Sequence, residues 1–228
     1  LEVLPDTATF FNFIASHDGI GVRPAEGILT TAEINALGDK TLAHGGRVSY
    51  KTNADGTQSP YALNITLFDA LSDPHGDEPE DLKINRFMAS QAIMLAMVGV
   101  PGIYVHSLVG SSNNIRGMEA TGRARTINRE KWQRADLEAR LDQPDSRSAK
   151  VFGRYTALLK ARAAHPAFHP NGSQHIVSND PALFALLRIA PDTGSNKQEK
   201  VVCLHNISAE TQPVDIDLSA YAIHNTLR

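Results

Sequence analysis

Residues 7–21 read TATFFNFIASHDGIG, and this stretch decides the fold that we expect. Its first part, residues 7–16, is short, apolar and aromatic, which predicts a buried β-strand. His17, Asp18 and Gly19 follow as a loop at the carboxyl end of that strand. A helix is predicted over residues 30–44, where Thr30 and Glu33 have the spacing of a capping box.

The rest of the chain continues this alternation and then changes in texture. A helix over 81–98, a strand over 102–105 and a helix over 147–164 are predicted, with loops over 47–60 and 110–145. Short alternating segments at 173–177, 183–189, 200–204 and 212–218 predict an antiparallel β module. Strands that alternate with helices favour an α/β fold, but these are too few to close an eight-stranded barrel. We therefore predict the C-terminal part of a (β/α)8 TIM barrel over residues 1–170, followed by a small antiparallel β domain over residues 171–228.

Composition excludes several classes of protein. The 228 residues are 42% hydrophobic and 21% charged, with a formal net charge of −3, so no basic excess points to nucleic acid. Cys203 is the sole cysteine, which excludes a disulfide framework and a thiolate zinc site. No apolar run is long enough to span a bilayer. We expect a soluble, cytoplasmic protein with no cofactor, metal, membrane or nucleic-acid partner.

Two groups of residues are candidates for chemistry. Asp18 follows a predicted barrel strand, the position where barrel enzymes place catalytic groups, although a turn-forming Asp18 with His17 beside it would explain the same dipeptide. Arginines are dense between Arg123 and Arg134, and a guanidinium can hold a sugar hydroxyl or a phosphate. A solvated loop with scattered surface arginines is the alternative for this second group.

Four motifs resemble one enzyme family. Residues 11–22, FNFIASHDGIGV, resemble the fourth conserved region of the α-amylase superfamily, glycoside hydrolase family 13, and more narrowly its sucrose-phosphorylase-like subfamily. Residues 59–65, SPYALNI, resemble the subfamily's acceptor loop, and residues 99–105, GVPGIYV, resemble its eighth-strand motif. Residues 125–129, RTINR, look like its Arg-x-Ile-Asn-Arg signature. The motifs occur in the family's order over nearly the whole chain.

The resemblance implies roles for particular residues. Asp18 matches the aspartate that stabilises the oxocarbenium-like transition state, and His17 matches a histidine that binds sugar hydroxyls. Arg125 matches the arginine that holds the far side of the glucosyl ring, with Arg123 as the alternative if the alignment slips by two residues. No match to the family's nucleophile or acid/base segment is present, so both carboxyl groups are expected on the remainder of the barrel. We expect the chain alone to be inactive.

The implied reaction is glucosyl transfer between an α-glucoside and inorganic phosphate, which gives α-glucose 1-phosphate. Tyr61 and Asn64 match positions of the acceptor loop, and Lys51 would meet an anionic acceptor. That pattern favours glucosylglycerate, then sucrose 6-phosphate, over sucrose. The alternatives are an α-amylase-family hydrolase or transglucosidase, or a non-catalytic carbohydrate-binding remnant. The apolar surface of an incomplete barrel would also favour a homodimer.

Overall fold

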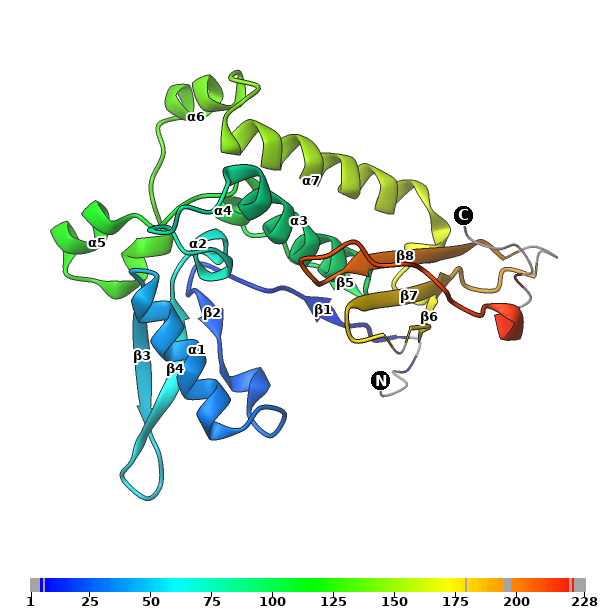
Figure 1. The fold of residues 1–228 in the computed structure, drawn as a ribbon, viewed down its shortest axis with the longest axis horizontal. Coiled ribbons are helices and arrows are strands. Elements are labelled where there is room, and N and C mark those ends of the chain that lie inside the picture. The colour runs from blue at the N-terminus through cyan, green and yellow to red at the C-terminus, as the bar shows by residue number, and fades with distance from the viewer. Residues whose placement is uncertain (1–4, 6, 179, 195–197, 222, 224–228) are drawn as a thin grey trace. The chain divides into compact units, whose positions relative to one another are not determined.

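Figure 1 shows the computed structural model, which describes residues 1–228 except 1–4, 6, 179, 195–197, 222 and 224–228. The chain divides into two compact units. The first unit combines Leu1–Asn12, Ala89–Gly102 and Thr156–Arg228, and the second combines Phe13–Met88 and Ile103–Tyr155. Two long helices, α3 (Glu80–Ala96) and α7 (Arg147–Ala164), contribute residues to both units, and their predicted bounds are confirmed within two residues.

The second unit is built on an antiparallel sheet in the order β2–β4–β3. Its strands are β2 (Ile20–Gly21), β3 (Arg47–Thr52) and β4 (Gln58–Asn64). Helix α1 (Thr31–Ala43) packs on this sheet, as Figure 1 shows, and begins at the predicted capping box of Thr30 and Glu33. A small core forms between them from Val22, Ile34, Leu63 and Ile65. Burial of these apolar side chains fixes the helix to the sheet.

The prediction of a loop over residues 47–60 is wrong, because this segment contains β3 and the start of β4. Pro60 made a strand look unfavourable in the sequence, because a proline has no N–H to donate to a β-ladder. The structure accommodates it with a register shift, in which Ser49 pairs with Ala62 while Tyr50 pairs with Pro60. Tyr61 is therefore the extra residue of a β-bulge.

The other regular elements described in the second unit are short helices. They are η1 (Arg23–Ala25), α2 (Leu67–Leu71), α4 (Val105–Leu108), α5 (Ile115–Thr121), η2 (Ala124–Asn128) and α6 (Arg134–Leu141). The prediction that residues 110–145 are rich in loops therefore missed the three short helices α5, η2 and α6. Such short helices carry no extended apolar period, and α6 has no buried residue, so the sequence gives little signal for them. They form because tertiary contacts and caps such as Asn114 stabilise them.

In the first unit, β1 (Phe11–Asn12) pairs in parallel with β5 (Val100–Pro101). The buried strand predicted over residues 7–16 is wrong in length and burial, because Phe11 and Phe13 are 67% and 56% exposed. A strand is buried on both faces only when other layers cover it. The strand predicted over 102–105 lies two residues too late, and Val105 instead begins α4.

The first unit also carries the antiparallel sheet β6–β7–β8. Its strands are β6 (Ser173–Ile176), β7 (Leu183–Ile189) and β8 (Lys200–Asn206), which confirms three of the four predicted segments. No strand forms over residues 212–218, where the chain runs as a loop before η4 (Ser219–Tyr221). The helical turn η3 (Pro166–Phe168) precedes this sheet. The domain boundary near residue 170 stays a prediction.

Two arginines, the buried Arg188 and the half-buried Arg162, bind carbonyl oxygens near the end of α3 within the first unit. Arg188 is 0% exposed and donates hydrogen bonds to the carbonyl oxygens of Ala96, His169 and Ser173. Arg162 donates to the carbonyl oxygens of Leu95, Met97 and Gly99. The last carbonyls of a helix have no partner within the helix, and cations near them are stabilising. Burial lowers the pKa of Arg188 to about 10, so it remains charged near neutral pH.

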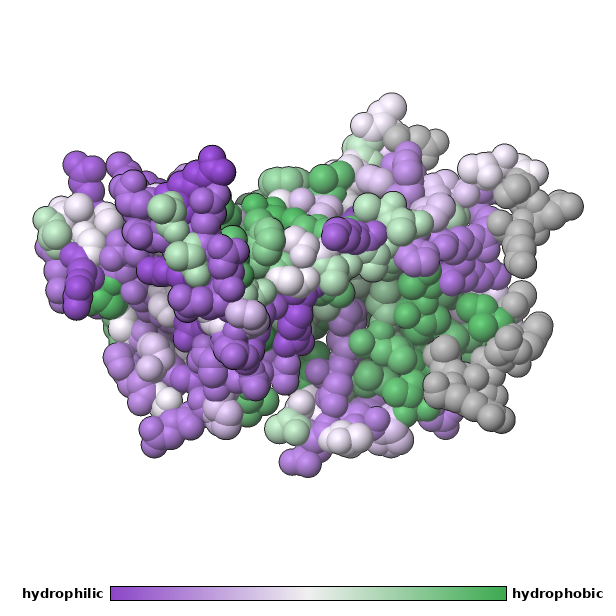
Figure 2. Space-filling model, turned by 90° about the horizontal axis from the view of Figure 1, so that it is seen from above, coloured by the Kyte–Doolittle hydropathy of each residue, from purple (hydrophilic) through white to green (hydrophobic). Residues whose placement is uncertain are grey.

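The surface mixes polar and apolar side chains. Ile28 is 81% exposed, and Figure 2 shows one face on which hydrophobic residues gather in patches between hydrophilic ones. Among the described residues, no helix combines the length and the hydrophobicity that crossing a membrane requires.

Replacement of Arg188 by methionine should destabilise the chain by about 3 kcal/mol or more. The variant leaves three carbonyl oxygens without their donor, and an unsatisfied buried polar group costs about 1–3 kcal/mol. Urea unfolding followed by circular dichroism measures the change. Arg134→Met, at a side chain that is 89% exposed, serves as the control and should shift the midpoint little. Equal midpoints for the two variants would show that the buried guanidinium is not needed.

Candidate functional site

The loop that carries His17 and Asp18 is a tight turn of the second unit. Ser16 and Gly19 exchange both backbone hydrogen bonds at 3.0 Å, and the Asp18 N–H donates to the Ser16 hydroxyl at 3.1 Å. Gly19 has a φ of +93°, and a Cβ there would lie 2.1 Å from the carbonyl oxygen of Leu63. Glycine is therefore required at this position, because β2 and β4 pair immediately beyond it.

Two guanidinium groups converge on the Asp18 carboxylate. Arg129 Nη2 donates to Asp18 Oδ1 at 2.7 Å, and Arg125 Nη1 lies 3.1 Å from the same oxygen. Arg129 also donates through Nε to the carbonyl oxygen of His17 at 2.7 Å, so it grips both the backbone and the side chain of the loop. His17 Nε2 lies 3.4 Å from Asp18 Oδ2.

The arginines reach the loop because η2 is fixed against it. Asn128 donates from Nδ2 to the carbonyl oxygen of Ser16 at 2.9 Å, and the Tyr104 hydroxyl donates to the carbonyl oxygen of Asn128 at 2.7 Å. Asn128 is 2% exposed. Sequence reasoning gave no role to Arg129 or Asn128, because a motif alone does not show which of its side chains point at Asp18.

The cluster presents an oriented anion at a partly open surface. The side chains of Asp18, Arg125 and Arg129 are 40–46% exposed, and that of His17 is 65% exposed, so a ligand can reach them. Charge-assisted hydrogen bonds hold the carboxylate in one orientation. Such an anion can bind hydroxyl groups and stabilise positive charge that develops near it.

The other residues named from the sequence are not gathered around Asp18. Arg123 is exposed, and no ion pair joins it to Asp18 among the described residues. Lys51 pairs with Glu26, and Tyr61 is 43% exposed on the bulge of β4. Asn64 is 0% exposed, and its amide donates to Ser49 Oγ at 2.8 Å within the hairpin, so its role in acceptor binding stays a prediction.

An aromatic group lies behind Tyr104. The centroid of the His106 ring lies 5.2 Å from that of Tyr104 and 4.3 Å from that of Trp132. Its Nδ1 is 3.0 Å from Ser111 Oγ. Desolvation lowers the pKa of His106, against the carboxylate and backbone carbonyl of Glu130, which raise it. The His106 imidazole is therefore uncharged at neutral pH and packs between the rings of Tyr104 and Trp132. Among the described residues, no three His, Cys, Asp or Glu side chains gather as metal ligands.

Comparison with known proteins identifies relatives over most of the chain. No profile of a known protein family matches it. It is 49% identical to the glucosylglycerate phosphorylase of Allomeiothermus silvanus over 214 residues, which cover 94% of this chain and 37% of the relative. Identity is 35% to the glucosylglycerate phosphorylase of Escherichia coli, covering 95% and 37%, and 30% to the sucrose 6(F)-phosphate phosphorylase of Ilumatobacter coccineus, covering 78% and 33%. The chain thus spans about 37% of the length of the first two relatives.

A solved structure shares the fold. The crystal structure of sucrose 6F-phosphate phosphorylase from Thermoanaerobacter thermosaccharolyticum matches with a TM-score of 0.66 at 22% identity. The match covers 84% of this chain and 36% of that protein. The mixed helices and sheets predicted from the sequence are therefore confirmed as a fold of this type.

Replacement of Gly19 by alanine should destabilise the second unit by about 2 kcal/mol or more, since it adds both a strained positive φ and a clash with the Leu63 carbonyl. Gly27→Ala is the matched control, because Gly27 also has a positive φ, +80°, but no atom of the described residues lies within 4 Å of its Cβ position. That variant should lose only about 1 kcal/mol. Chemical denaturation measures both, and the clash is refuted if the two losses are equal.

Replacement of His106 by glutamine should flatten the acid side of the stability profile. The pKa of His106 is lowered on folding, so the unfolded chain binds more protons as the pH falls through about 6.5, and stability falls with it. The variant lacks this contribution. Unfolding free energies measured between pH 7.5 and pH 5 should therefore decline less steeply than in the unmodified chain. Parallel profiles would contradict the prediction.

Proposed function

We propose, because the chain is homologous to the C-terminal part of the sucrose-phosphorylase-like glucoside phosphorylases, that it forms part of such an enzyme. The proposed enzyme transfers a glucosyl group with retention between an α-glucoside and inorganic phosphate, giving α-glucose 1-phosphate. In fold terms, we propose that residues 1–170 are the last strands and helices of a (β/α)8 barrel. The convergence of Arg125 and Arg129 on Asp18 is the observation that carries the proposal.

In this mechanism Asp18 acts as a fixed anion. A carboxylate nucleophile and a carboxylic acid, both on the remainder of the barrel, form and then break a covalent glucosyl intermediate. The acid protonates the departing glycosidic oxygen, and as the conjugate base it later takes the proton from the attacking phosphate. Each half-reaction passes through a transition state with positive charge on the sugar ring. Asp18 stabilises that charge and holds ring hydroxyls, and His17 and Arg125 bind the hydroxyls around it.

Arg129 is the positioning residue of this arrangement. It binds the carbonyl oxygen of His17 and the carboxylate of Asp18 at 2.7 Å each, so the loop cannot swing without breaking both bonds. Because Arg129 neutralises part of the Asp18 charge on Oδ1, the second oxygen, Oδ2, is the one available to the sugar. Asn128 supports it from η2.

The proposed glucoside is glucosylglycerate, followed by sucrose 6-phosphate and then sucrose. Two relatives with 49% and 35% identity are named glucosylglycerate phosphorylases. The hairpin β3–β4 adjoins the Asp18 loop through the pairing of Ile20 with Leu63 and carries Lys51 and Tyr61. For Lys51 to meet an anionic acceptor, it would exchange its bond to Glu26. The cytoplasmic location, the homodimer and the absence of nucleic-acid partners stay predictions.

A chimera tests the proposal. This chain replaces the corresponding part of a glucosylglycerate phosphorylase, which supplies the missing carboxyl groups, and release of glucose 1-phosphate is measured with glucosylglycerate and phosphate. We expect turnover that needs phosphate, and a fall of at least about 10³-fold in kcat for Asp18→Asn, in line with loss of a group that stabilises the transition state. The chain alone should give none.

Asp39→Asn, an exposed aspartate of α1, is the control and should retain the activity of the chimera. Glucose release without phosphate would instead indicate a hydrolase. A folded chimera that loses activity equally with both substitutions, or that turns over nothing, would contradict the proposed role.

A further inference from the structure

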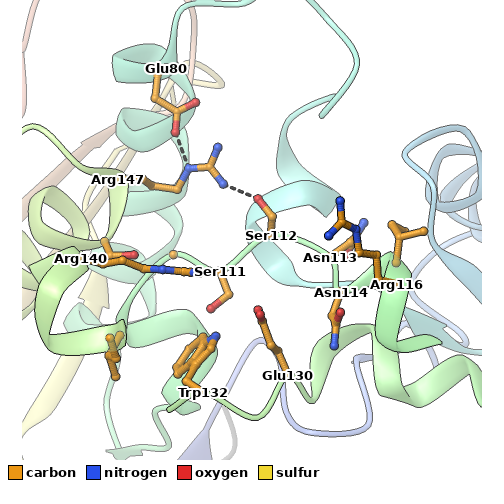
Figure 3. A pocket seen from close by; sticks show the side chains of 14 residues that line it. Glu80, Ser111, Ser112, Asn113, Asn114, Arg116, Glu130, Trp132, Arg140 and Arg147 are labelled. Atoms are coloured by element: carbon orange, nitrogen blue, oxygen red, sulfur yellow. Dashed lines mark hydrogen bonds and ion pairs between the residues drawn. The ribbon is translucent and has the colours of Figure 1, made fainter. Parts of the chain in front are cut away.

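A hollow opens in the second unit, and none of the residues that line it belongs to the Asp18 cluster. Its cavity volume is about 560 Å³, within the range of about 300–1,000 Å³ that small-molecule sites occupy. Figure 3 shows its polar lining, in which Arg140, Ser111 and Trp132 lie on one side and Glu130, Asn114 and Arg116 on the other. Arg129 and Glu130 are neighbours in sequence, yet Arg129 binds Asp18 while Glu130 lines this hollow.

The wall of the hollow is preformed by a hydrogen-bonded loop. Asn113 accepts from the Thr66 N–H at 2.9 Å, donates to the His44 carbonyl oxygen at 3.2 Å, and donates its own N–H to Asp69 Oδ2 at 2.7 Å. Asp69 is 3% exposed, and its burial raises its pKa. Because folding already orders this loop, binding of a ligand does not lose the entropy of ordering it.

The opposite wall is held by Arg147. Its guanidinium binds Glu80 and Ser112 and lies 4.1 Å from the centroid of the Phe68 ring. This arginine is therefore compensated, and its charge is not available to a ligand. Figure 3 shows the two bonds at the edge of the hollow.

Two other arginines of the lining are uncompensated. Within the described part of the chain, no carboxylate lies within ion-pair distance of Arg116 or Arg140. Figure 3 shows the guanidinium of Arg140 directed toward Ser111. Glu130 is the acidic residue that remains once Glu80 is paired, so the hollow has an excess of positive charge. Guanidinium groups in this state bind phosphate by charge-assisted hydrogen bonds.

Trp132 supplies an aromatic surface with an unused donor. Its indole lines the hollow and packs edge-on with His106, which is itself bonded to Ser111. The Trp132 Nε1–H is buried and has no hydrogen-bond acceptor among the residues that the structure describes. A buried donor without a partner costs about 1–3 kcal/mol, so an acceptor oxygen brought by a ligand would be favoured.

We propose that this hollow binds a sugar monophosphate. Arg140 and Arg116 attract the phosphate, the sugar ring packs against the indole of Trp132, and Ser111, Asn114 and Glu130 bind its hydroxyl groups. A small rotation of the indole brings Nε1–H to an oxygen of the ligand. The excess of positive charge favours a phosphate, and the aromatic and neutral polar side chains favour a sugar. This proposal does not rest on the phosphorylase function, because no residue of the Asp18 cluster takes part.

The single tryptophan of the chain makes the test direct. Trp132 is the only tryptophan among the 228 residues, so its fluorescence reports on this hollow alone. The chain is titrated with α-glucose 1-phosphate, with glucose and with inorganic phosphate, and each titration is repeated by calorimetry. We expect saturable binding of glucose 1-phosphate with a Kd of about 1 mM or tighter, and binding at least about tenfold weaker for glucose or phosphate alone.

Variants locate the site. Arg140→Gln should weaken glucose 1-phosphate binding at least about tenfold, since a charge-assisted contact is lost. Arg134→Gln, on the same helix and outside the hollow, is the matched control and should bind as the unmodified chain does. Circular dichroism checks that both fold. Asp18→Asn should leave the fluorescence titration unchanged.

Four results would overturn the proposal. The first is the absence of both a fluorescence change and a heat of binding with glucose 1-phosphate. The second is equal affinity for inorganic phosphate, which would make the hollow a simple anion site. The third is equal binding by the Arg140 and Arg134 variants. The fourth is loss of binding in Asp18→Asn, which would place the ligand at the Asp18 cluster and leave the proposed phosphorylase function standing.

Discussion

The grip of Arg129 on the loop at His17 and Asp18 is the interaction on which the functional surface depends. One guanidinium holds a backbone carbonyl and a carboxylate at once, at 2.7 Å each. The arrangement requires Asn128 to pin η2 to Ser16 and Gly19 to let the loop lie against β4. An exposed ion pair alone contributes little stability, so the value of this cluster lies in orienting Asp18.

Arginine has a different task in the first unit. Arg188 and Arg162 point at carbonyl oxygens near the end of α3, and Arg188 is 0% exposed. Burial of a cation is costly unless hydrogen bonds compensate it. Several backbone carbonyls provide that compensation at once, which satisfies the helix end and ties β7 to it. The same residue type thus stabilises the fold in one unit and orients a carboxylate in the other.

The residues from Arg129 to Trp132 contribute side chains to both the Asp18 cluster and the hollow of the second unit. Arg129 serves Asp18, while Glu130 and Trp132 line a hollow with uncompensated arginines. His106, whose pKa burial lowers, lies between Tyr104 and Trp132 and contacts both rings. The proposed phosphorylase site and the proposed sugar-phosphate site are therefore served by neighbouring residues of one short segment of backbone.

The sequence by itself determined the elements whose signals are local: the capping box of α1, the long apolar helices α3 and α7, and the alternating strands β6, β7 and β8. It also supplied the two motifs that contain Asp18 and Arg125, at residues 11–22 and 125–129. Only the tertiary structure decided that Pro60 lies in a bulged strand, that Phe11 is exposed, and that Arg129 points at Asp18. These depend on contacts between residues far apart in the chain, which local periodicity and propensity do not encode.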